Sequence, residues 1–140
     1  MSNPKDDSLE RIECDILAEQ HGARVVIRRV MRKAYDTLDD RAQGRLSKAM
    51  KRWCDDPSQL TQEMFNPSEG RTSRQNIMLK AFKAFKVRLY GFSTSVDEKR
   101  TFIIVDADTA KKQNKADPVI LKRAKNKIDD LLDEKCKKGL

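Results

Sequence analysis

Hydrophobic residues recur with helical spacing in three stretches of the chain and alternate with polar residues in others. The first helical stretch, residues 8–20, follows a loose capping signal in which Asp7 precedes Glu10 by three residues. Its apolar residues at helical spacing are Leu9, Ile12, Ile16 and Leu17. We therefore expect a short amphipathic helix that ends at His21 and Gly22.

A strand and a long helix are predicted next. Residues 24–30 are rich in β-branched side chains and predict an opening strand whose arginines face solvent. The following block has a cap at Asp36 or Thr37, acidic residues in its first turn and one apolar face. That face consists of Leu38, Ala42, Leu46, Ala49, Met50 and Trp53. It predicts a helix of about four turns that ends before Asp55.

The middle of the chain changes from loop composition to strand composition. Residues 57–76 hold two prolines and Gly70 among polar residues, which predicts a loop, and loops of this length in compact domains are often functional. In the sequence FKVRLYGF that follows, apolar and basic residues alternate. Phe85, Val87 and Leu89 point one way, and Lys86, Arg88 and Tyr90 point the other. We expect a core side and a basic side with an aromatic residue.

The last third of the chain predicts a hairpin and a final helix. Residues 93–99 have turn composition, and residues 101–106 predict the antiparallel partner strand. Asp117 is placed to cap a last helix that has Pro118 at its first position. The buried stripe of this helix is Ile120, Leu121, Ala124, Ile128, Leu131 and Leu132. These patterns predict an α+β domain with an antiparallel sheet and a C-terminal helix.

The composition limits the class of protein. The chain has 140 residues, 38% hydrophobic and 37% charged, which suits one compact domain. No apolar run approaches membrane-spanning length and the acidic N-terminus lacks the build of a signal peptide, so we expect a cytoplasmic protein with no membrane partner. Cys14, Cys54 and Cys136 form no CxxC pair, and His21 is the one histidine. We expect reduced thiols, no metal site and no cofactor.

The net charge of +8 is distributed unevenly along the chain. Residues 1–20 hold two basic and six acidic residues (−4), whereas residues 71–115 hold eleven and four (+7). Clustered cations attract polyanions because each cation placed at a phosphate releases condensed counterions. A nucleic acid, RNA above all, is therefore the expected partner. The alternative is a solvated, solubilising face.

The basic side of the predicted sheet is the candidate binding surface. Successive side chains on one side of a strand lie about 7 Å apart, which matches the spacing of phosphates along a nucleic-acid strand. Tyr90, or an exposed Phe92, would stack a base. The other candidate nucleic-acid-binding residues lie in the preceding loop and strand and in the basic turn: Arg71, Arg74, Lys80, Lys83 and Lys115.

Four segments carry a resemblance to a known family. LDDRAQGRLSKAMKRW is followed in order by AFKVRLYGF, FIIVDAD and KKQNKAD. With these segments the chain resembles the RelE/ParE toxin superfamily, specifically its HigB-like, phage-associated branch. The resemblance implies a small RelE-like antiparallel sheet of three to five strands with helices packed on one face. It also implies a toxin domain at residues 24–133, between an acidic helical extension (residues 1–23) and a basic tail (residues 134–140).

The resemblance implies a toxin that cleaves messenger RNA, on the ribosome in many relatives, and that a cognate antitoxin neutralises. The family's central-strand arginine, followed by a hydrophobic residue and an aromatic, matches one place in this chain, and its basic pair another. The catalytic residues implied in this way are Arg88, Lys86, Tyr90, Lys111 and Lys112. In cleavage by a ribose 2′-OH, the cations would stabilise the charge on the phosphoryl oxygens.

One feature of the family is missing. Relatives often have a histidine or tyrosine near the last strand or the basic turn, where this chain has Asp106, Ala107, Asp108 and Thr109. A general acid and base would have to come from Tyr90, from these aspartates or from a lysine with a lowered pKa. A metal-independent endoribonuclease is the leading expectation. Two alternatives stay open: a ParE-like topoisomerase inhibitor, and a non-catalytic nucleic-acid- or partner-binding module of phage or mobile-element origin.

The acidic N-terminal helix has two expected roles. Its charge of −4 is opposite to the +7 of residues 71–115, so one role is to cover the basic face. The other is to pack its apolar stripe on the core or at a homodimer contact. An antitoxin would be an acidic or amphipathic segment that wraps the domain.

Overall fold

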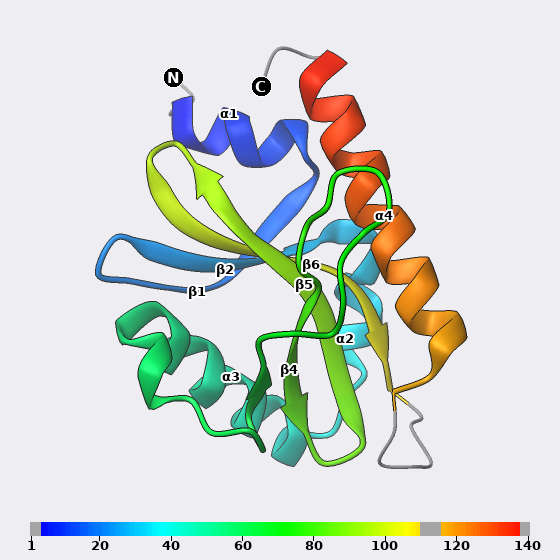
Figure 1. Cartoon of the computed structure of the whole chain (residues 1–140). Helices are drawn as coiled ribbons and strands as arrows, with labels where there is room; N and C mark the ends of the chain where they lie inside the picture. Colours follow the sequence, from blue (N-terminus) through cyan, green and yellow to red (C-terminus); the bar gives the residue numbers. More distant parts are fainter. Residues whose placement is uncertain (1–3, 110–115, 138–140) are drawn as a thin grey trace.

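A computed structural model describes residues 4–109 and 116–137, with side chains described for residues 8–109 and 116–133. Within these residues the chain forms four α-helices, six strands and two short 3₁₀ turns (Figure 1). The helices are α1 (Pro4–Arg11), α2 (Arg32–Asp36), α3 (Asp40–Asp55) and α4 (Pro118–Lys137). The strands are β1 (Cys14–Gln20), β2 (Ala23–Arg28), β3 (Phe65–Asn66), β4 (Lys80–Ala84), β5 (Val87–Val96) and β6 (Lys99–Asp108). No helix in these described ranges is long and apolar enough to cross a membrane.

The strands form one mixed sheet in the order β1-β2-β6-β5-β4-β3. Neighbouring strands are antiparallel except for β2 and β6, which run parallel, with Val25 opposite Phe102. The predicted α+β class, the hairpin of β5 and β6 and the C-terminal helix are confirmed. The prediction of three to five strands is wrong, because β1 adds a sixth strand. The prediction of a wholly antiparallel sheet is also wrong, because the chain passes through α2, α3 and strands β3 to β5 before β6 pairs in parallel with β2.

Helices cover both faces of the sheet, so the expectation of helices on one face is wrong (Figure 1). α3 packs on one face, where Leu46, Met50 and Trp53 join Phe82 and Phe102 in one core. α1 and α4 pack on the other face over a second core. The physical reason is that consecutive residues of the central strands are apolar, as in the buried run of β2, and such strands bury both faces.

The N-terminal segment differs from its prediction. The helix stops at Arg11, and residues 14–20 form the edge strand β1, which pairs with β2 across a tight turn at His21 and Gly22. Both turn residues have positive φ, 53° and 75°, as a two-residue hairpin requires. Pairing with β2 therefore overrides the helical spacing, and Ile16 is 42% exposed. The part of the stripe on α1 and just after it, Leu9 and Ile12, packs in the second core as expected.

The two long helices follow their predictions closely. The N-cap of α3 is Asp39, three or two residues after the predicted caps, and its carboxylate accepts a hydrogen bond from the Ala42 N–H at 2.7 Å. In α4, the Asp117 carboxylate accepts from the Val119 N–H at 2.9 Å, and Pro118 takes the first helical position. The predicted apolar stripes of both helices are buried or partly buried against the sheet.

Candidate nucleic-acid interface

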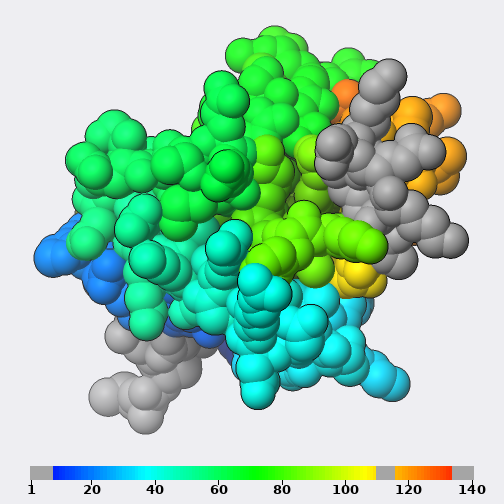
Figure 2. Space-filling view, turned by 90° about the horizontal axis from the view of Figure 1, so that it is seen from below, coloured from blue at the N-terminus to red at the C-terminus, as the bar shows by residue number. Residues whose placement is uncertain are grey.

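A stripe of cations runs along α3. Its members, spaced four, three and four residues apart, are Arg41, Arg45, Lys48 and Arg52. Residues at this spacing lie on one side of a helix. The neighbouring side is the apolar stripe that packs on the sheet, so burial of that stripe directs the cations outward along the edge of the contact. Figure 2 shows this face of the molecule, with α3 in teal beside the lighter green of the turn between β4 and β5.

A hollow of about 220 Å³ lies beside this stripe and is here called the basic hollow. Its cations come from α3 and from strand β4: Arg45, Lys48, Arg52 and Lys83. Thr61, Glu63 and Met64 of the loop after α3 complete its wall. Four cations and one carboxylate give it a strong positive charge, which favours an anionic occupant.

Phe85 holds two of the arginines in place beside the hollow. It lies in the turn between β4 and β5 with a φ of 55° and is 48% exposed. The guanidinium carbons of Arg41 and Arg45 lie 4.4 and 4.5 Å from the centroid of its ring, which is cation–π geometry. Lys86 follows in the same turn and is exposed. The turn thus adds a cation and orders two more.

These cations form no salt bridges with carboxylates of the described residues. Among the side chains that the structure describes, no carboxylate forms an ion pair with any member of the stripe, with Lys83 or with Lys86. Most arginines elsewhere are paired, as Arg29 is with Glu10 and Asp15. Burial, helped by the charge of Arg88, lowers the pKa of Lys83, and the charges of Glu69 and Glu63 offset this shift only in part. An anion bound in the basic hollow would offset the free-energy cost of burying the charged Lys83 ammonium.

The predicted catalytic strand is not an exposed surface. Arg88 is 12% exposed and its Nη1 lies 2.8 Å from Oε1 of Glu69, itself 6% exposed. Tyr90 is fully buried in the second core with α4, and burial raises the pKa of its hydroxyl to about 12. Phe92 is buried in the same core. The expectation that this side of β5 stacks a base is therefore wrong, because α4 covers it.

The other predicted residues are scattered over the molecule. Arg71 donates to the backbone oxygen of Asn76 within its own loop, and Arg74 forms ion pairs with three aspartates of α4, the shortest 2.6 Å to Asp130. Lys80 points into a different hollow, on the α3 side of the sheet. Lys83 is the one of them that lines the basic hollow. Lys111, Lys112 and Lys115 lie outside the described residues.

Two proposed acid–base residues, Asp106 and Asp108, are buried on β6. The carboxylate of Asp106 accepts hydrogen bonds from Arg123 at 2.7 and 2.9 Å and lies 3.3 Å from Nζ of Lys127. Burial by itself would raise the pKa of Asp106, but the hydrogen bonds from Arg123 and the Ala107 N–H and the charge of Lys127 lower it below its usual value. Asp106 therefore anchors α4 to the sheet as an ionised carboxylate.

Three further polar or reactive side chains are buried and have structural roles: Arg24, Cys14 and Cys54. Arg24, expected to face solvent, is 2% exposed and donates to Oγ1 of Thr101 and to the backbone oxygen of Val96. The two thiols are buried, and burial raises the pKa of Cys14 to about 12, which keeps it unreactive. Within the described residues, no group of three or more histidines, cysteines and acidic residues is arranged to hold a metal ion.

The stripe on α3 is a candidate site that the distribution of charge along the sequence did not predict. The prediction located the cationic excess by counting charges over blocks, and residues 21–70 carry only +3, ten basic against seven acidic. The signal was nevertheless present in the sequence, since the four cations repeat every three or four residues without an intervening acid between Arg41 and Arg52.

Comparison of the chain with family models, with curated proteins and with solved structures found no significant match.

Proposed function

We propose that this protein binds nucleic acid through the basic hollow and the cationic stripe of α3, and that it contacts the phosphate backbone. The observation that carries the proposal is a hollow with four cations from two elements that have no carboxylate partner among the described side chains. Cations held in place but not neutralised suit phosphate oxygens, which accept paired hydrogen bonds from guanidinium groups.

The dimensions of the stripe fit a short run of backbone. From Arg41 to Arg52 the helix rises by about 16 Å, which spans roughly three consecutive phosphates of a single strand, and Lys83 on β4 is placed for a fourth. The cation–π contacts with Phe85 restrict two of the arginines before binding, so less conformational entropy is lost when a phosphate binds. Such contacts position a backbone without reading its sequence.

RNA is the partner to test first, in keeping with the sequence-based prediction, and a cytoplasmic location belongs to the same proposal. A RelE-like variant of the fold, cleavage of messenger RNA, an antitoxin and inhibition of a topoisomerase stay predictions. No catalytic step is part of the proposal, because Tyr90 is buried and Arg88 is paired with Glu69. The proposal thus takes the non-catalytic alternative and moves the binding surface from β5 to α3.

The test is a binding titration with labelled 12-nucleotide single strands, one of RNA and one of DNA, followed by fluorescence anisotropy at fixed salt. The variant Arg45→Gln with Lys48→Gln removes two cations from the hollow. We expect it to weaken binding about ten-fold or more, because each lost contact at a phosphate removes a charge-assisted hydrogen bond. Tighter binding of RNA than of DNA would identify contacts to the 2′-OH.

The matched control is Arg11→Gln with Lys122→Gln, two exposed cations on the face formed by α1 and α4. It changes the net charge by the same amount and should bind like the wild type. Equal weakening by both double variants would show only general attraction of a basic protein and would overturn the proposed site. An intact RNA band after incubation is the expected companion result, and discrete fragments would instead support the ribonuclease prediction.

A further inference from the structure

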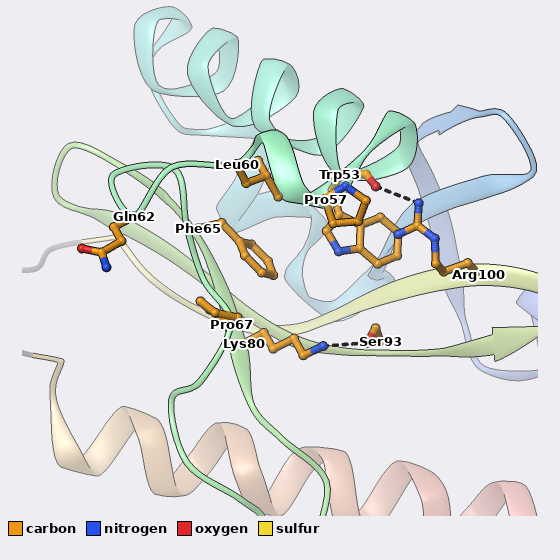
Figure 3. A pocket seen from close by; sticks show the side chains of 9 residues that line it. All are labelled: Trp53, Pro57, Leu60, Gln62, Phe65, Pro67, Lys80, Ser93 and Arg100. Atoms are coloured by element: carbon orange, nitrogen blue, oxygen red, sulfur yellow. Dashed lines mark hydrogen bonds between the residues drawn. The ribbon is translucent and has the colours of Figure 1, made fainter.

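A second hollow of about 430 Å³, here called the aromatic hollow, lies on the α3 side of the sheet beyond the end of α3 (Figure 3). Its volume is within the range of roughly 300–1,000 Å³ that small-molecule sites occupy. The apolar part of its wall is formed by Trp53, Pro57, Leu60, Phe65 and Pro67. Two of these side chains are fixed by other rings, since Trp53 packs 5.7 Å from Phe102 and Phe65 packs 5.0 Å from Phe82.

Two cations and a hydroxyl line the same hollow from three neighbouring strands. Nζ of Lys80 on β4 donates to Oγ of Ser93 on β5 at 3.0 Å. Arg100 on β6 places its guanidinium 4.0 Å from the Trp53 ring centroid and donates to the backbone oxygen of Trp53 at 2.8 Å (Figure 3). It also donates to the backbone oxygen of Cys54 at 3.0 Å. Strands next to one another lie about 4.8 Å apart, so this row is compact.

Neither cation of this row has a carboxylate partner among the described side chains. Burial lowers the pKa of Lys80, because its ammonium is partly removed from water without a compensating negative charge. A bound anion would supply that charge. The hollow therefore combines an anion site with an apolar wall, which suits a ligand that carries a negative group beside a flat ring.

The two hollows share a wall. In the loop that follows α3, Thr61, Glu63 and Met64 face the basic hollow, while Leu60, Gln62 and Phe65 face the aromatic hollow. On α3 the consecutive residues Arg52 and Trp53 likewise line one hollow each. A ligand that spans this wall would meet phosphate-binding cations on one side and an apolar site with two cations on the other.

We infer that the aromatic hollow binds one nucleotide of the strand whose neighbouring phosphates occupy the basic hollow. The base lies against Leu60, Phe65 and the prolines, and the phosphate of that nucleotide receives hydrogen bonds from Lys80 and Arg100. The inference rests on the proposed function for the identity of the ligand. It adds a site in which one base is unstacked from its neighbours and bound by the protein, which backbone binding alone does not require.

Trp53 makes the test direct, because it is the only tryptophan of the chain and it lines the aromatic hollow. The labelled RNA 12-mer is titrated while two signals are recorded: anisotropy of the label, which follows binding of the strand, and Trp53 emission, which follows the hollow. Lys80→Met keeps the aliphatic part of the side chain and removes the charge. Lys99→Met is the control, since Lys99 pairs with Glu19 outside the hollow. Arg100 stays unchanged because it lies on the Trp53 ring.

We expect both signals to change with the same midpoint, and Lys80→Met, but not Lys99→Met, to weaken binding about ten-fold and to reduce the emission change. If anisotropy rises while Trp53 emission and the Lys80→Met affinity stay unchanged, the strand binds at the basic hollow alone and the inference is overturned.

If the RNA does not bind at all, the proposed function is overturned and adenosine 5′-monophosphate decides the inference, with adenosine and inorganic phosphate as separate probes. A change in Trp53 emission with the nucleotide that Lys80→Met weakens and Lys99→Met does not would support a nucleotide site. No change in emission with any of the three probes would overturn it.

Discussion

Gly91 is the position where a single methyl group would do most harm. It lies at the bulge between β5 and β6, and a Cβ there would approach the backbone oxygen of Ile103 to 2.1 Å and the ring of Phe102 to 2.6 Å. Backbone atoms of a central strand cannot move aside at low cost. Gly44 is the opposite case, because a Cβ on this helical residue meets nothing within 4 Å.

Replacement of each glycine by alanine should therefore have effects of opposite sign. Gly91→Ala should destabilise the protein by about 3 kcal/mol or more through overpacking. Gly44→Ala should stabilise it by about 0.5–1 kcal/mol, since alanine favours the helix interior. Urea unfolding followed by circular dichroism measures both. A Gly91→Ala protein as stable as the wild type would contradict the described register at the bulge.

Phe85 allows a test of the ordered arginines at the level of one side chain. Phe85→Leu keeps an apolar residue in the turn but removes the ring face on which Arg41 and Arg45 lie. The ring orders both guanidinium groups before binding, and loss of about 0.5–1 kcal/mol of this ordering should weaken RNA binding about two- to five-fold. Phe85→Tyr keeps the ring and should bind like the wild type. Equal affinities of all three proteins would exclude this role of Phe85.

Individual residues were predicted well where one element decided their surroundings. Trp53 and Met50 are in the core because helical periodicity alone places them there. Phe85 and Tyr90 were predicted wrongly, since their exposure depends on where a hairpin turns and on which helix crosses the strand. Alternation along β5 correctly separates Leu89 from Tyr90, but it does not show that α4 lies over the second side.

The docking of α4 on the sheet depends on ionised carboxylates. Asp106 holds Arg123 and Lys127 of the helix, and Asp129, buried on α4, accepts from the N–H groups of Arg74 and Gln75 in the long loop at 3.0 and 3.1 Å. Burial opposes ionisation in both, yet the hydrogen bonds and charges around them lower the pKa of each. These contacts join helix, sheet and loop into one unit.

The sign of the pH dependence follows from these pKa values. A carboxylate whose pKa is lower in the folded than in the unfolded protein stabilises the fold above the unfolded value, here 3.8. That stability is lost as the pH falls from 3.8 through the folded value. Asp106→Asn should cost about 2 kcal/mol at pH 7 and flatten this acid dependence. Thermal unfolding between pH 7 and pH 3 measures both effects.

Asp130→Asn is the control for this measurement. Asp130 lies next to Asp129 on α4, but its side chain is exposed and its ion pair with Arg74 is at the surface. Exposed pairs of this kind contribute little, so the change in stability should stay below about 0.5 kcal/mol. A loss as large as that of Asp106→Asn would contradict the distinction between buried and exposed carboxylates on this helix.

Among the elements, long periodic segments were predictable and short ones were not. α3, α4 and the hairpin of β5 and β6 lie where their patterns placed them. Residues 14–20 have helical spacing but form β1, because hydrogen bonds to β2 satisfy their backbone. The spacing of apolar residues within one segment does not predict its pairing with another strand.

At the scale of the whole molecule, the distribution of charge matters more than its total. The +8 predicted a polyanion partner, and the +7 of residues 71–115, eleven basic against four acidic, directed attention to β5. The fold distributes those cations over both faces and pairs several of them, while the cations of α3 lie together beside Lys83. The proposed partner class rests on composition, whereas the proposed surface depends on the packing of α3 against β4.

The salt dependence of RNA binding tests this account most directly, because its slope counts the phosphates that cations contact. If the four cations of the basic hollow each meet a phosphate of a single strand, the logarithm of the affinity should fall with the logarithm of the salt concentration with a slope of about −3. In Arg45→Gln with Lys48→Gln the slope should become shallower by about 1.4. Arg11→Gln with Lys122→Gln should keep the wild-type slope. An unchanged slope in the first double variant would contradict the account.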